Sequence, residues 1–165
     1  MTKPAFYRVV TVFDKEETIE SLSTKTGLAK SSLKKYLVFL EKEGIVGKTL
    51  NKYWLTEKGR ALKETLQKIM SGYEATPYVF TEPDTGAPIP LQVRNIKQLL
   101  VVLKYGLVEK KIAEEHFRRG YLVQWIRDGV GDKYLSMLIS TGKVKNIDEL
   151  IAYLDKIVKI AGNTK

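Results

Sequence analysis

In several stretches of the chain, apolar residues recur every three or four positions, the spacing of one face of an amphipathic helix. The clearest stretch in the first half covers residues 30–43. Its apolar positions are Leu33, Tyr36, Leu37 and Leu40. A shorter helix is predicted just before it, because Thr26-Gly27 can end a helix and reverse the chain. A first helix is expected over residues 6–13. Its apolar positions are Phe6, Val9, Val10 and Phe13.

Two short β-prone runs follow the third predicted helix. They are Ile45-Val46 and Tyr53-Trp54-Leu55, and Gly44 before them can end the helix. The residues between the two runs, 47–52, form the predicted tip of a hairpin. A further helix begins near Thr56. Its apolar side is Leu62, Leu66, Ile69 and Met70. The first 72 residues are therefore expected to form three helices, a hairpin and a trailing helix.

The next segment, residues 73–93, is predicted to be a connector because it holds four of the five prolines. Tyr78, Val79 and Phe80 are too apolar for a free linker, so this part is expected to pack as an extended segment. From Ile96 the helical spacing returns and continues to about Ala161. The predicted fold is therefore mainly α: a domain over residues 1–72, a proline-rich connector over 73–93 and an all-helical domain over 94–165.

The charge of the chain indicates an anionic partner. The net charge is +9, and residues 1–72 hold 14 Lys and Arg against 8 Asp and Glu. Positive charge is thus concentrated in the first domain, as in proteins that bind nucleic acid. The chain has no cysteine, which excludes disulfides and cysteine-based zinc sites. Because it shows neither a signal-peptide core nor an apolar run of membrane-spanning length, we expect a cytoplasmic protein.

Three pieces of the first domain together resemble the winged helix-turn-helix superfamily, in particular small prokaryotic and archaeal transcriptional regulators. They are TGLAKSSLKKYLVFLEKEGIV, the strand pair around Asn51, and LTEKGRAL. The resemblance implies a DNA-binding domain with three helices and a β-hairpin wing. It also implies that the helix from Lys30 to Glu43 enters the major groove and that the wing touches the backbone or the minor groove.

On this basis we expect DNA contacts from the exposed face of that helix and from the wing. The candidate residues are Lys30, Ser31, Ser32, Lys34, Lys35, Lys48 and Lys52. Lysine and serine side chains bind phosphates and base edges, but no Arg, Asn or Gln occupies the helix face. Affinity is therefore predicted to come mainly from phosphates. Family members carry Ser or Thr where Ala29 stands, so the helix lacks that cap and its first amides can meet a phosphate.

The rest of the chain gives weaker evidence for a functional site. The phosphate-loop, HExxH and GxSxG motifs are absent, so we expect no catalysis, cofactor or metal. His116, the single histidine, is expected to pack within the fold. An arginine–aromatic cluster allows two interpretations. It can hold RNA, an acidic peptide or DNA, or its tryptophan can pack under the arginine side chains by cation–π contact. It consists of Arg118, Arg119, Tyr121, Trp125 and Arg127.

Residues 79–140 resemble a poorly characterised prokaryotic helical domain, and this resemblance implies no activity. The functional prediction is a homodimeric, double-stranded-DNA-binding transcriptional regulator with a possible protein partner at its C-terminal domain. One alternative is an architectural or replication/segregation protein that binds DNA with little sequence preference. The other is a protein-interaction adaptor whose winged helix does not bind DNA.

Overall fold

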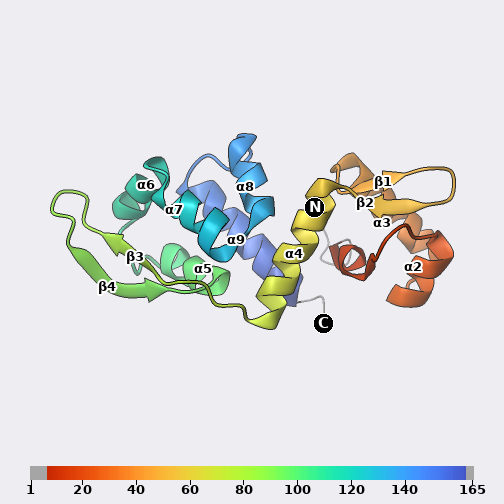
Figure 1. Ribbon diagram of the computed structural model, residues 1–165, viewed down its shortest axis with the longest axis horizontal. Helices are drawn as coiled ribbons and strands as arrows, with labels where there is room; N and C mark the ends of the chain where they lie inside the picture. Colours follow the sequence, from red (N-terminus) through yellow and green to blue (C-terminus); the bar gives the residue numbers. More distant parts are fainter. Residues whose placement is uncertain (1–6, 163–165) are drawn as a thin grey trace. The chain divides into compact units, whose positions relative to one another are not determined.

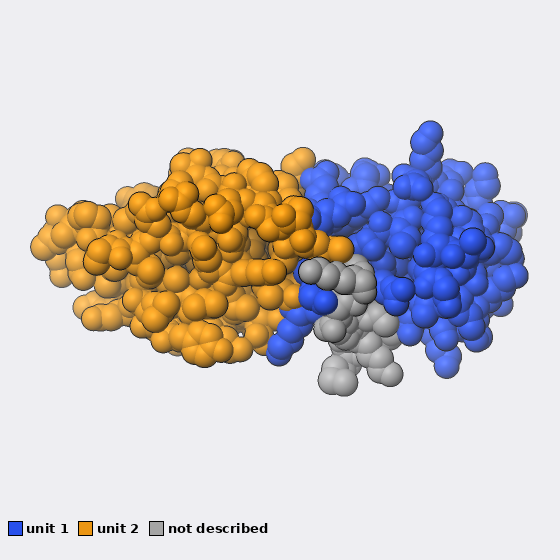
Figure 2. All heavy atoms as spheres, turned by 90° about the horizontal axis from the view of Figure 1, so that it is seen from below, with its two compact units in different colours: residues 1–67, 159–165 blue, residues 68–158 orange. Residues whose placement is uncertain are grey.

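The computed structural model describes residues 7–162, which are mainly helical, with two separate two-stranded antiparallel sheets (Figure 1). The chain divides into two compact units (Figure 2). The first unit comprises residues 1–67 and 159–165, and the second comprises residues 68–158. Phe6, the first apolar position of the predicted first helix, lies outside the described residues.

The first unit follows the predicted order of elements. Its elements are the 3-10 helix η1 (Val9–Val12), α2 (Ile19–Thr26), α3 (Lys30–Lys42), β1 (Val46–Lys48), β2 (Tyr53–Leu55) and the start of α4 (Glu57–Ser71). The Thr18 side chain caps α2 by accepting a hydrogen bond from the Ser21 amide at 3.1 Å. Gly27 ends this helix with a φ of 72°, a left-handed conformation that glycine adopts without steric cost.

The core of the first unit lies between η1, α2, α3 and α4. Its fully buried side chains are Val9, Val10, Phe13, Leu22, Leu33, Leu37, Leu40, Ile45, Leu62 and Leu66. Burial of each such side chain contributes about 1.5–3 kcal/mol, which fixes the inward face of α3. Tyr36, which the spacing also placed on that face, is only half-buried.

The wing is the β1–β2 hairpin, in which Val46 pairs with Leu55 and Lys48 pairs with Tyr53. The chain just before α2 extends this small sheet: the Glu17 amide donates to the Tyr53 carbonyl at 2.7 Å, and the Tyr53 amide donates back at 2.8 Å. These paired bonds attach β2, at its end next to the hairpin tip, to the segment that leads into α2. The strands of the wing are therefore held beside that segment, while residues 49–52 at the tip are exposed.

The start of α4 approaches the end of the α3–β1 connection closely. Thr56 caps α4 by accepting from the Gly59 amide at 3.1 Å, and its hydroxyl donates to the Gly44 carbonyl at 2.6 Å. A β-carbon at Gly59 would lie 2.1 Å from the backbone oxygen of Ile45. The glycine is therefore required by close backbone packing, even though a glycine weakens an ordinary helix.

The second unit combines a β-hairpin with helices. Its elements are β3 (Tyr78–Thr81), β4 (Pro88–Val93), α5 (Ile96–Lys104), α6 (Lys110–Arg118), α7 (Tyr121–Gln124), the π-helical turn η2 (Trp125–Val130), α8 (Lys133–Ser140) and most of α9 (Ile147–Gly162). The proline-rich segment read as a connector thus contains a hairpin. Phe80 and Val93 are fully buried, and this burial holds the hairpin against its own unit. Pro88 and Pro90 are tolerated because a two-stranded sheet consists only of edge strands.

His116 is buried beneath this hairpin, which agrees with its predicted packing role. Its Nε2 lies 3.1 Å from both the amide nitrogen and the carbonyl oxygen of Thr81. Nδ1 lies 2.5 Å from the Tyr78 hydroxyl. Burial raises the pKa of that hydroxyl, which therefore stays protonated. These bonds fix β3 to α6.

Candidate nucleic-acid interface

The exposed face of α3 carries all five candidate residues that the sequence placed on this helix. Leu33, Leu37 and Leu40 share one face of α3 and point into the core, so the residues on the opposite face of the helix are left to solvent. Lys30, Ser31, Lys34 and Lys35 are exposed, and Ser32 is half-exposed. Three of the four exposed side chains are cationic, and they lie within the first two turns of the helix.

The cations of this face differ in how they are paired. Lys30 lies 3.4 Å from Glu20. The pKa of Glu20 is lowered, first by a hydrogen bond from its own backbone amide and then by Lys30. An ion pair this exposed contributes little to stability, so Lys30 can exchange its partner at little cost. Within residues 7–162, no carboxylate forms an ion pair with Lys34 or Lys35.

The N-terminus of α3 adds backbone donors to this surface. Ala29 occupies the N-cap position in an extended conformation and provides no side-chain hydrogen bond. The first amide to bond within the helix is that of Leu33, which donates to the Ala29 carbonyl at 3.0 Å. The preceding amides lack the side-chain acceptor that Thr18 gives to α2. They carry the positive end of the helix dipole, which favours an anion at this point.

Lys48 and Lys52 lie on either side of the wing tip, and both are exposed. The Thr49 amide donates to the Lys52 carbonyl at 2.9 Å, which closes the tip. Lys52 is 3.4 Å from Glu16, with both side chains more than half exposed, and Lys48 lies 5.8 Å from the centre of the Tyr53 ring. Neither contact removes the charge from solvent, so the wing presents two cations.

Two exposed apolar side chains of this unit were not among the candidate residues. Val38 on α3 is 53% exposed, and Leu50 at the wing tip is 101% exposed. Val38 falls outside the apolar spacing of its helix, and Leu50 interrupts a polar hairpin tip, so both break a pattern that the sequence displays. Single exposed apolar side chains are common on protein surfaces, so neither residue by itself marks a binding site.

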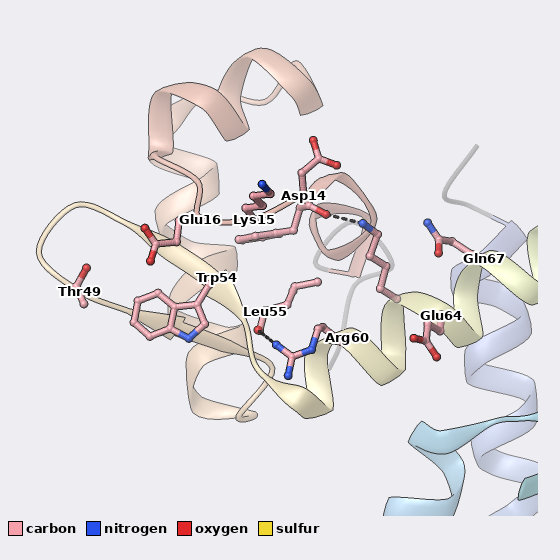
Figure 3. A pocket seen from close by; sticks show the side chains of 11 residues that line it. Asp14, Lys15, Glu16, Thr49, Trp54, Leu55, Arg60, Glu64 and Gln67 are labelled. Carbon is pink, nitrogen blue, oxygen red and sulfur yellow. Dashed lines mark hydrogen bonds between the residues drawn. The ribbon is translucent and has the colours of Figure 1, made fainter.

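A cavity of about 630 Å³ opens beside the wing, between Trp54 and the side chains of α4 (Figure 3). Its charged lining residues, among those described, are Asp14, Lys15, Glu16, Arg60, Lys63 and Glu64. Three are acidic and three are basic, so their charges balance. Arg60 donates to the Leu55 carbonyl at 3.0 Å and Lys63 donates to the Phe13 carbonyl. These cations hold the fold together, and the cavity adds little to the positive surface.

The Trp54 side chain packs against the β1–β2 hairpin. A β-carbon at Gly47, its cross-strand partner, would lie 2.5 Å from the Trp54 ring, so the indole lies against the backbone of β1. The ring is half-buried there. This geometry favours a packing role for Trp54 over base stacking.

The three arginines of the arginine–aromatic cluster lie next to carboxylates. Arg118 and Arg119 both contact Glu115, and Arg127 lies 2.9 Å from Asp128. Trp125 is buried, donates to the Thr76 carbonyl at 2.7 Å and packs against Tyr78 rather than under an arginine stem. The arginine–aromatic cluster therefore has less unpaired positive charge than the face of α3.

A short three-helix core, a turn between α2 and α3, and a two-stranded wing define a winged helix-turn-helix domain. Comparison with known families agrees: residues 9–73 match the family described as winged helix-turn-helix, and this part of the chain is such a domain. The family suggests DNA binding. The comparison with curated proteins gives no match. None of the helices within residues 7–162 has the length and apolar character needed to cross a membrane.

Proposed function

We propose that this protein is a transcriptional regulator that binds double-stranded DNA, with α3 in the major groove and the wing on the adjacent backbone. The observation that carries this proposal is the exposed face of α3, where Lys34 and Lys35 have no carboxylate partner within the described residues. Unpaired cations at the start of the second helix of a helix-turn-helix lie where the major groove and its flanking phosphates are expected.

Phosphate contacts supply most of the affinity in this proposal. The five lysines of the interface are Lys30, Lys34, Lys35, Lys48 and Lys52. If each neutralises one phosphate, the logarithm of the binding constant falls by about 4.5 for each tenfold increase in salt. The exposed positions of α3 hold no Arg, Asn or Gln for planar, two-bond reading of a base, so base reading through the major groove is modest.

We further propose that the protein acts as a homodimer. A single small DNA-binding module buries only about 600–1,000 Å² of protein surface, and two modules bring the interface into the range of specific complexes. In this scheme residues 1–72 bind DNA, and the rest of the chain provides self-association or holds a protein partner. Regulation then follows from occupying a promoter and excluding polymerase.

The alternatives predict different DNA behaviour. An architectural or replication/segregation protein binds duplexes with the same salt dependence but without sequence enrichment, and an adaptor does not bind DNA at all. The test is selection of bound duplexes from a randomised library at near-physiological salt, followed by sequencing. A two-fold symmetric motif with half-sites about 10 base pairs apart is the expected result. Recovery without enrichment would favour the architectural role, and no recovery would contradict DNA binding.

A further inference from the structure

The cavity beside the wing has the size of a small-molecule site (Figure 3). Its volume is about 630 Å³, and sites for small ligands usually have about 300–1,000 Å³. Its walls belong to three parts of the first unit: residues 13–16 before α2, the wing residues Thr49, Trp54 and Leu55, and one side of α4. A ligand in this cavity would therefore touch the wing, the helix that follows it and the segment that leads into α2.

Two of the three acidic residues of the lining are paired with lysines from outside the cavity. Asp14 lies 2.8 Å from Lys25, and Glu16 lies 3.4 Å from Lys52. The hydrogen bond and the charge of Lys25 lower the pKa of Asp14. Glu64 is the third, and it forms no ion pair within the described residues. The lining therefore holds one carboxylate that no cation compensates.

The three cations of the lining form no ion pair with a carboxylate in the part of the chain that the structure describes. They are Lys15, Arg60 and Lys63. Lys63 donates to the Phe13 carbonyl. Arg60 donates to the Leu55 carbonyl at 3.0 Å through one of its three side-chain nitrogens. A carbonyl does not neutralise a cation, and the remaining guanidinium N–H groups match a carboxylate or a phosphate. The cavity therefore favours an anion.

Trp54 gives the cavity an aromatic wall. Its indole lies against the backbone of β1 at Gly47 and is half-buried, so part of the ring stays accessible. Within the described residues its Nε1–H donates to no acceptor, whereas that of Trp125 donates to the Thr76 carbonyl at 2.7 Å. An accessible ring beside unpaired cations suits a ligand that joins an apolar part to an acid group.

We propose that this cavity binds a small organic anion, with its carboxylate or phosphate on Arg60 and Lys63 and its apolar part against Trp54, and that this ligand weakens DNA binding. Arg60 and Lys63 lie three positions apart on α4, so their side chains leave the same face of the helix. The effect on DNA rests on the proposed function. It follows from the contact of Glu16 with Lys52, because an anion in the cavity adds negative charge beside a lysine of the DNA interface.

NMR spectra of the ¹⁵N-labelled full chain test the ligand site without DNA, because the two tryptophans give one indole signal each. Phenylacetate and phenyl phosphate are titrated at constant ionic strength, and the tighter of the two tells a carboxylate ligand from a phosphate ligand. 2-Phenylacetamide removes the charge, and acetate removes the ring. The tighter acid should shift the Trp54 signal with a Kd on the order of 1 mM and leave the Trp125 signal in place. The amide and acetate should bind at least about tenfold more weakly.

Three variants locate the site. Arg60→Gln should weaken binding of the tighter acid about tenfold. Lys15→Gln should weaken it about threefold at an unchanged urea midpoint, since Lys15 forms no side-chain hydrogen bond within the described residues. Lys97→Gln removes the same charge from an exposed position of the second unit and should change nothing. Equal binding of the amide and the acids, or equal affinities of the three variants, would overturn the inference.

The effect on DNA is measured with one duplex at matched ionic strength. A saturating concentration of the tighter acid should weaken duplex binding about fivefold, while the amide has no effect. Unchanged duplex affinity with the acid bound would overturn the regulatory part of the inference. A protein that binds the acid at Trp54 but binds no duplex would overturn the proposed function and leave the ligand site in place.

Discussion

At the scale of single residues, two missing interactions shape the proposed DNA interface: a side-chain helix cap and an ion-pair partner. Ala29 gives α3 no side-chain cap, and Lys34 has no carboxylate partner among the described residues. Both features leave positive potential at the start of α3. The absent cap could be predicted from the position of Ala29 before the helical spacing begins, because N-cap preferences are local.

Ala29→Ser tests the role of the first amides of α3. Ala29 already has the extended backbone of an N-cap, so a serine hydroxyl can accept from an amide of the first turn. The free energy of unfolding should rise by about 0.5–2 kcal/mol in urea titrations. DNA affinity should fall about two- to fivefold, because the hydroxyl competes with a phosphate for those amides. Gained stability with unchanged affinity would show that no phosphate uses them.

Other properties of single residues could not be predicted from the sequence. The ion pairs of Lys30 with Glu20 and of Lys52 with Glu16 join residues that are 10 or more positions apart, and only the folded chain brings them together. The full exposure of Leu50 also depends on the exact conformation of the wing tip. Local spacing contains no information on such long-range contacts.

At the scale of elements, local sequence predicted most of the first unit: helical spacing predicted α3 and α4, Thr26-Gly27 predicted the end of α2, and two β-prone runs predicted the wing. Residues 73–93 show no helical spacing; their prolines predicted a connector and their apolar run Tyr78-Val79-Phe80 predicted an extended, packed segment, and the structure has the β3–β4 hairpin there. Proline restricts the backbone but is compatible with an edge strand, so composition alone could not decide between the two. The burial of Phe80, which holds this hairpin, depends on helices far along the chain.

The contact between α4 and Ile45 gives a prediction at this scale. Gly→Ala in an ordinary helix stabilises it by about 1 kcal/mol. Gly59→Ala should instead lower the free energy of unfolding by about 1–3 kcal/mol, because its β-carbon would collide with the Ile45 oxygen. Gly162→Ala is the control, since no atom outside its own helix lies within 4 Å of a β-carbon there. Urea unfolding measures both variants, and equal or higher stability for Gly59→Ala would contradict the close approach.

At the scale of the whole molecule, positive charge is distributed unevenly. The net charge is +9, and residues 1–72 account for +6 of it. Much of the arginine charge in the second unit is matched by neighbouring carboxylates, whereas Lys34 and Lys35 remain unpaired within the described residues. The excess of positive charge in residues 1–72 could be predicted from the sequence. Which lysines lack a carboxylate partner could not be predicted, because that depends on side-chain positions in the folded chain.

The salt dependence of DNA affinity tests the central claim most directly. The full chain, the variant Lys34→Ala/Lys35→Ala and the charge-matched control Lys97→Ala/Lys111→Ala are titrated with one duplex over a series of salt concentrations. Lys97 and Lys111 are exposed lysines of the second unit, so the control removes the same charge outside the interface. The account predicts weaker binding for the α3 variant and a slope of log K against log salt that is shallower by about 2, with little change in the control. Equal slopes for the α3 variant and the unmodified chain would contradict the assignment of α3 as the DNA-binding helix.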